Sequence, residues 1–159
     1  MSLRHTALFV SSGATAAITG TAVATIEEAD IVAGGKTIII TLTGDTWVAA
    51  GATFEAQRQA IINGLDAASS PTNGWNNEVR DNEVVTAVVR TSDTIVTITL
   101  TAQAGYDISA QEVITVTVPN AALVTNTSDI TGVPTFSVDA VVSGLSIPVA
   151  MYNYRRRRA

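Results

Sequence analysis

The chain of 159 residues has no cysteine, one histidine and one lysine. Without cysteine there is no disulfide framework, no thiolate nucleophile and no cysteine-ligated metal. The only histidine, His5, lies in a short N-terminal segment, whereas a Ser–His–Asp or Cys–His arrangement needs a rigidly positioned histidine. A histidine cluster for zinc or iron is also absent from the sequence.

Long hydrophobic runs are absent as well. No apolar run approaches the ~18 residues that a membrane helix needs. The apolar patch near the N-terminus is shorter than the ~7–15 residues of a signal-peptide core. We therefore expect no membrane partner, and synthesis in a cytoplasm before assembly.

Charge is scarce and unevenly placed. Charged residues make up 14% of the chain, against roughly 25% in a typical soluble domain. Since scattered charge, lysine above all, keeps monomers soluble and protects sheet edges, this scarcity predicts a surface hidden against partners. The alternative is a neutral, threonine-rich surface that is simply well hydrated.

Four of the nine basic residues form the C-terminal run Arg155–Arg158, so the remainder carries five basic against fourteen acidic residues. An acidic body argues against nucleic-acid binding by the domain itself. Only the arginine run remains a candidate for that role.

Threonine and valine dominate, with 23 and 19 residues. Both are β-branched and favour strands. The clearest strand lies within 106–123, where Ile114, Val116 and Val118 alternate with Thr115 and Thr117 and Pro119 ends the run.

The remaining elements are shorter. Further strands are predicted at 15–26, 36–43, 84–90, 95–100 and 135–142. Turns are predicted at 27–35, where Gly34-Gly35 is typical of a hairpin, and at 91–94, which joins 84–90 and 95–100 in a β-hairpin. The pattern predicts a mainly β antiparallel sandwich over 15–142, with arms at 1–14 and 143–159.

One helix is predicted, over 54–68. Thr53 is the expected N-cap and Glu55 lies in the first turn, where the helix dipole favours an anion. Phe54, Ile61, Ile62 and Leu65 form an apolar stripe. Gly64 within this helix costs about 1 kcal/mol relative to alanine.

The segment 69–82 is predicted to be a polar loop. Trp75 within it either fills the local core, which we favour, or is offered to a partner.

No pattern of catalytic residues is present. The carboxylates fall mostly in turns, where they ordinarily make local hydrogen bonds. A calcium ion between two loops is an alternative, although no segment has EF-hand spacing. We expect no enzyme activity, no cofactor, no metal and no small-molecule substrate.

The two arms are too apolar to be idle tails. We expect them to pair with neighbouring chains, and the arginines to meet an acidic patch on a neighbour; nucleic acid and a solvated charge run are the alternatives. The predicted assembly residues are Leu3, Leu8, Phe9, Val10, Ile147, Val149, Met151, Tyr152, Tyr154, Arg155, Arg156, Arg157 and Arg158.

Four segments together carry a resemblance: TIIITLTGDTWVAAGATFEAQRQAIINGL, SSPTNGWNNEVRD, VVTAVVRTSDTIVTITL and YDISAQEVITVTVPNAAL. The run from about Ile26 to Val138 resembles immunoglobulin-like domains with one helical insert, found in virion proteins of tailed phages. The resemblance implies an immunoglobulin-like sandwich and a non-catalytic structural role in the virion. It transfers no catalytic residues.

The leading hypothesis is a multi-copy capsid decoration or cement protein, clamped by its arms to copies of itself or to the major capsid protein. The alternatives are a tail or neck component, and an adhesin-like module that stacks sugars on exposed Trp47 or Trp75.

Overall fold

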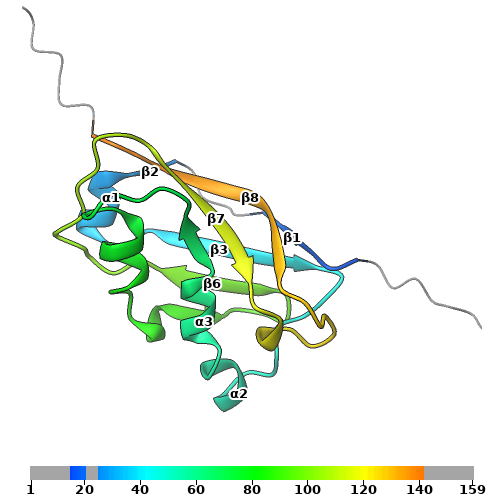
Figure 1. Ribbon diagram of the computed structural model, residues 1–159. Coiled ribbons are helices and arrows are strands. Elements are labelled where there is room, and N and C mark those ends of the chain that lie inside the picture. The colour runs from blue at the N-terminus through cyan, green and yellow to red at the C-terminus, as the bar shows by residue number, and fades with distance from the viewer. Residues whose placement is uncertain (1–14, 21–24, 142–159) are drawn as a thin grey trace, which may run out of the picture.

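The computed structural model describes residues 15–20 and 25–141, without the side chains of residues 133 and 134. This part of the chain is mainly β. It contains eight strands in two four-stranded sheets, together with a few short helices. Figure 1 shows the sheets as two layers.

The first sheet has the strand order β1-β3-β6-β5 and is antiparallel throughout. Its strands are β1 (Ala17–Thr19), β3 (Thr37–Thr43), β6 (Ile95–Thr99) and β5 (Val88–Arg90). Val88 pairs with Ile98, so β5 and β6 form the hairpin that the sequence predicts.

The second sheet has the order β2-β8-β7-β4 and is mixed, because β2 pairs parallel to β8. Its strands are β2 (Ile26–Glu27), β8 (Ile130–Asp139), β7 (Glu112–Val118) and β4 (Leu65–Ala67). The β7–β8 register shifts between Ile114 and Val116, which marks a bulge.

One hydrophobic core lies between the sheets. The predicted alternation in β7 is confirmed: Ile114, Val116 and Val118 are fully buried, and Thr115 and Thr117 lie on the other face. The β3 prediction is also confirmed, with Ile38, Ile40 and Leu42 facing the core. The two apolar sheet faces therefore cover each other.

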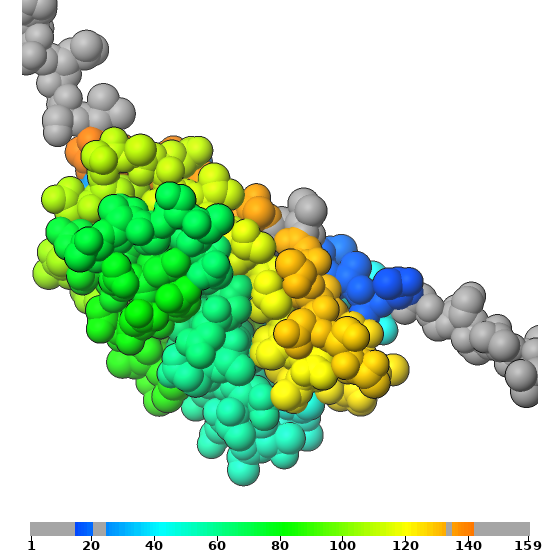
Figure 2. All heavy atoms as spheres, in the orientation of Figure 1, coloured from blue at the N-terminus to red at the C-terminus, as the bar shows by residue number. Residues whose placement is uncertain are grey.

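The predicted helix over 54–68 is wrong at both ends. Helical structure occurs as α2 (Ala52–Glu55) and α3 (Arg58–Asn63), and 65–67 is strand β4. In Figure 1 and Figure 2, α2 lies at one end of the described body. The helix stops at Gly64 because its carbonyl accepts a hydrogen bond from Thr117 N of β7 at 2.7 Å. Thr53 is not the N-cap, since α2 begins after Gly51.

The predicted turn at 27–35 is also wrong, because it contains helix α1 (Glu28–Ala33). The helix ends at Gly34, whose φ of 71° suits glycine; a Cβ there would lie 2.6 Å from Ala102 N. Gly34 and Gly35 therefore link a helix to β3 and do not form a hairpin turn.

Several further boundaries differ from the prediction, including the start of the predicted strand 84–90. The predicted strand 15–26 divides into β1 and β2, which belong to different sheets. The loop 69–82 contains a π-helix, η1 (Trp75–Arg80), and 85–87 is a 3₁₀ turn, η2 (Val85–Ala87), ahead of β5. A second 3₁₀ turn, η3 (Asn120–Ala122), follows Pro119. The last strand begins at Ile130, earlier than the predicted 135.

Candidate functional site

Three carboxylates are buried in the described part of the chain, and each of them holds backbone in place. They are Asp45, Glu83 and Glu112, with exposed fractions of 6%, 7% and 3%. Glu83 accepts hydrogen bonds from Thr101 N and Thr101 Oγ1 and so ties the segment after η1 to the end of β6. Glu83 therefore holds these two segments together.

Asp45 braces the opposite end of the sandwich. Its carboxylate accepts hydrogen bonds from the backbone N–H groups of Thr46, Thr125 and Asn126, at 2.7, 3.0 and 2.8 Å. Burial alone raises the pKa of Asp45, but these hydrogen bonds outweigh it and leave the pKa below the usual 3.8.

We expect Asp45→Asn to lower the free energy of unfolding at pH 7 by about 1.5–3 kcal/mol, because the hydrogen bonds then lose their charged acceptor. Folding lowers this pKa, so the stabilisation is present above the unfolded value near 3.8 and is lost as the pH falls through the folded value. Urea unfolding of wild type and variant at pH 7 and pH 3 measures the loss of stability and its dependence on pH. A gap between wild type and variant that is equally large at pH 3 would contradict the assignment.

The third buried carboxylate, Glu112 at the start of β7, accepts hydrogen bonds from Trp75 N at 2.8 Å and from Tyr106 Oη at 2.7 Å. Burial raises the pKa of Tyr106, and the neighbouring Glu112 raises it further, so the phenol stays protonated and donates. Glu112 thus joins β7, η1 and the segment before β7.

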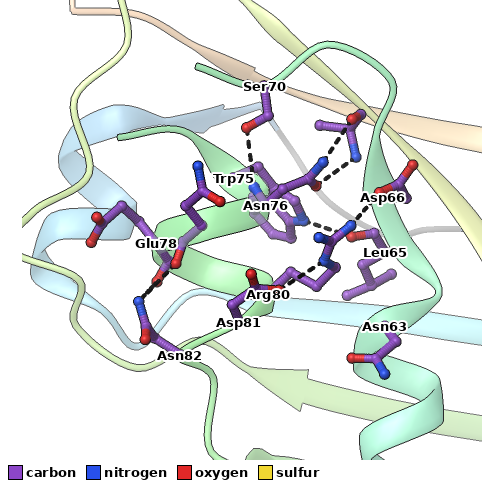
Figure 3. Close-up of polar contacts among 12 residues, drawn as sticks. Asn63, Leu65, Asp66, Ser70, Trp75, Asn76, Glu78, Arg80, Asp81 and Asn82 are labelled. Carbon is purple, nitrogen blue, oxygen red and sulfur yellow. Dashed lines mark hydrogen bonds and ion pairs between the residues drawn. The ribbon is translucent and has the colours of Figure 1, made fainter. Parts of the chain in front are cut away.

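The π-helix η1 covers the outer edge of β4. Trp75 Nε1 donates to Leu65 O at 2.8 Å, and the Asn76 side chain both accepts from Ala67 N and donates to Ala67 O. In Figure 3 these side chains lie against β4, and Arg80 reaches Asp66 and Asp81. The edge is thereby closed to pairing with another strand.

Both tryptophans belong to the core. Trp75 is fully buried and packs edge-on against Phe136, with ring centroids 5.3 Å apart, which confirms the prediction that it fills the local core. Trp47 is also buried and packs edge-on against Phe54. The adhesin-like alternative required one of these rings to be exposed, and that expectation is wrong.

The outer face of the first sheet, which we call the open face, has no charged side chain. The buried residues of β3 and β6 point inward, so the residues between them form this face. Thr97 lies at its centre, paired with Ile39 on one side and Val89 on the other. The open face consists of Ala17, Thr19, Thr37, Ile39, Thr41, Thr43, Val89, Ile95, Thr97 and Thr99.

Charge is separated between the described residues and the ends of the chain. All fourteen acidic residues are described but only four basic ones are, so this part carries a formal charge of −10. Each of the four pairs with an acid: Lys36 with Asp30, Arg58 with Glu55, Arg80 with Asp66 and Asp81, and Arg90 with Asp93. The five remaining basic residues are Arg4 and Arg155–Arg158.

All of the predicted assembly residues, from Leu3 to Val10 and from Ile147 to Arg158, lie outside the described residues. Within the described part, no three histidine, aspartate or glutamate residues are grouped so that they could hold a metal ion. No helix there is long and apolar enough to cross a membrane.

The described surface includes two shallow hollows lined by residues of the second sheet and its neighbours. One, of about 360 Å³, lies between α3 and the end of β7, and the other, of about 340 Å³, lies beside Glu112.

No protein-family model, no curated protein and no solved structure matches the chain.

Proposed function

We propose that this chain is a non-catalytic structural protein of a tailed-phage virion, present in many copies as a capsid decoration or cement protein. In this proposal the two-sheet body is an immunoglobulin-like sandwich, and the helical segment between β3 and β4 is its insert. The sequence resemblance supports the placement, and the arrangement of two packed sheets with the helical segment at 52–63 is compatible with it.

The observation that carries the proposal is the uncharged open face on a body with a formal charge of −10. Copies of such a body repel one another unless the contact avoids the acidic residues. The open face is a surface of that kind, since its threonine and isoleucine side chains can be covered without burying a charge.

The open face alone is small for a stable interface. Side chains on one face repeat about every 6.7 Å along a strand and 4.8 Å between strands, so ten residues cover roughly 300 Å² in projection. A stable interface buries about 800 Å² per partner. The arms are therefore needed, and each large apolar side chain that they bury contributes roughly 1.5–3 kcal/mol before the entropy of ordering is subtracted.

We expect the full-length protein to form discrete oligomers and Thr97→Glu to dissociate them. The new carboxylate would be buried between Ile39 and Val89 of the open face, and an unpaired buried charge costs several kcal/mol. The association constant should fall at least about 100-fold, as measured by sedimentation equilibrium.

The matched control is Thr131→Glu, which adds the same charge at an exposed position of β8 in the second sheet. It should leave the oligomer intact. Equal masses for wild type and Thr97→Glu would refute the role of the open face. Electron microscopy of virions separates the two locations, because a decoration protein follows the capsid lattice and a tail or neck component forms a ring or tube.

A further inference from the structure

The hollow of about 340 Å³ beside Glu112 is built from two separate segments. It is lined by Ser69, Ser70 and Pro71 before η1, and by Ser109, Ala110, Gln111 and Glu112 at the start of β7. Apart from Glu112, none of these residues is charged. We call this hollow the Glu112 pocket.

The carboxylate of Glu112 is only half satisfied. Oε2 accepts both hydrogen bonds, from Trp75 N and Tyr106 Oη, whereas Oε1 is buried without a hydrogen-bond partner in the described structure. A buried carboxylate oxygen that lacks a donor is costly to leave unpaired. Glu112 Oε1 can therefore accept a further hydrogen bond.

The unpaired oxygen is adjacent to the pocket wall. A Cβ placed on Gly74 would lie 2.7 Å from Glu112 Oε1, 2.6 Å from Ser70 Oγ and 2.5 Å from Pro71 Cδ. Oε1 thus adjoins the two residues that form one side of the pocket. A ligand in the pocket reaches the oxygen only if Ser70 and Pro71, which lie outside any helix or strand, move and the hydrogen bonds from Asn76 N to Ser70 Oγ and from Gly74 N to Pro71 O adjust.

A cation is the donor that the charges favour. All four basic residues of the described part are paired with other acids, so Glu112 has no cationic partner among them. Acidic residues also lie next to the lining residue Gln111, outside the pocket itself. Gln111 bonds to Asp139, Asp139 pairs in register with Glu27, and Glu28 accepts a hydrogen bond from Val141 N.

The chain itself carries a matching group. Val141, whose N–H donates to Glu28, is followed in the sequence by residues 142–159, which include the arginine run Arg155–Arg158. A guanidinium group presents paired N–H donors that suit a carboxylate, and it is less strongly hydrated than an ammonium group. The Glu112 pocket and the arginine run are thus complementary in charge.

We propose that the Glu112 pocket binds a guanidinium group from the arginine run Arg155–Arg158 of a second copy of this chain. The guanidinium donates to Glu112 Oε1, and the acidic residues on the Gln111 side of the pocket, Asp139 and Glu27, attract the remaining arginines. This inference rests on the proposed assembly function and names one of its contacts.

The first test is peptide binding. The receptor is the full-length chain with Arg155–Arg158 replaced by glutamine, and the probe is a synthetic peptide of residues 152–159. We expect Glu112→Gln in this receptor to weaken binding at least about tenfold, because a charged hydrogen bond is lost. A peptide with lysine at all four arginine positions should bind several-fold more weakly than the arginine peptide.

The matched control is Glu83→Gln, which removes one buried charge that does not line the pocket. It should leave peptide affinity within about twofold. Ala110→Trp, at an exposed position of the pocket lining, should block the peptide while both Glu112 hydrogen bonds stay intact. Near-ultraviolet circular dichroism establishes that each variant retains its fold.

The second test decides between a second copy and the same chain. Full-length Glu112→Gln lacks the pocket contact, and the four-glutamine variant lacks the arginines. If the contact joins two copies, a mixture of the variants associates more tightly than either variant alone, because each supplies what the other lacks. If the run folds back on its own chain, mixing restores nothing, and the proposal fails.

These results separate the inference from the function on which it rests. Equal peptide affinity for Glu112→Gln and its parent, or equal weakening by Glu83→Gln, overturns the pocket assignment. If the pocket assignment fails but Thr97→Glu still dissociates the oligomers, the proposed assembly function remains supported.

Discussion

Gly64→Ala is expected to destabilise the protein by about 3 kcal/mol, at the upper end of the usual range for overpacking. A Cβ at this position would lie 1.9 Å from Thr117 O, a backbone atom of the central strand β7. The oxygen cannot rotate away, since Gly64 O and Thr117 N also form a 2.7 Å hydrogen bond. Urea unfolding followed by circular dichroism measures the loss.

The sequence alone predicts the opposite sign. Alanine is better than glycine in a helix interior by about 1 kcal/mol, so Gly64→Ala would stabilise a helix that continued to residue 68. The control is Gly132→Ala in β8, where nothing lies within 4 Å of the new Cβ and a small gain is expected. A Gly64→Ala variant more stable than wild type would show that β4 does not approach β7 as described.

Trp75→Ala is expected to lower the free energy of unfolding by about 3–5 kcal/mol. The ring is fully buried and packs edge-on against Phe136 of β8. Its Nε1 also donates to Leu65 O, so the substitution both opens a cavity and releases the edge of β4. Thermal and urea unfolding with far-ultraviolet circular dichroism measure the effect.

The control for this prediction is Trp75→Phe. It keeps an aromatic ring against Phe136 and leaves Leu65 O without its donor, so about 1–3 kcal/mol should be lost. If Trp75→Ala lowers the free energy of unfolding by less than about 1 kcal/mol, Trp75 lies near the surface. An exposed ring would then be present on which a sugar could stack, as the adhesin-like alternative requires.

Elements with a strict period of two were predictable from the sequence. In β3 and β7 the apolar residues alternate with threonine, and both strands have one buried face. The local pattern agrees with the tertiary environment in these strands, because one face packs against the core along its whole length and the other does not. The burial of Trp75 was predictable for a related reason, since a large apolar ring in a polar segment is best placed in the core.

The elements between these strands were decided by contacts that are distant in sequence. Residues 65–67 have the composition of a helix end, yet they form a strand that pairs with β7. The pairing begins at the hydrogen bond from Thr117 N to Gly64 O. Residues 75–80 form a helix that covers the edge of β4. Trp75 and Asn76 make its hydrogen bonds to β4 residues that lie 10 and 9 positions earlier in the chain. Propensity is weak compared with such packing.

By itself, the sequence determined the β class of the protein, its two best strands, the scarcity of charge and the separation of the arginine run from an acidic body. These follow from composition and from local periodicity. Only the tertiary structure decided that the open face is uncharged and that one oxygen of Glu112 is unpaired beside a pocket. Both depend on which strands are neighbours and on which groups are left without partners, and pairing between distant residues is not encoded in any local pattern.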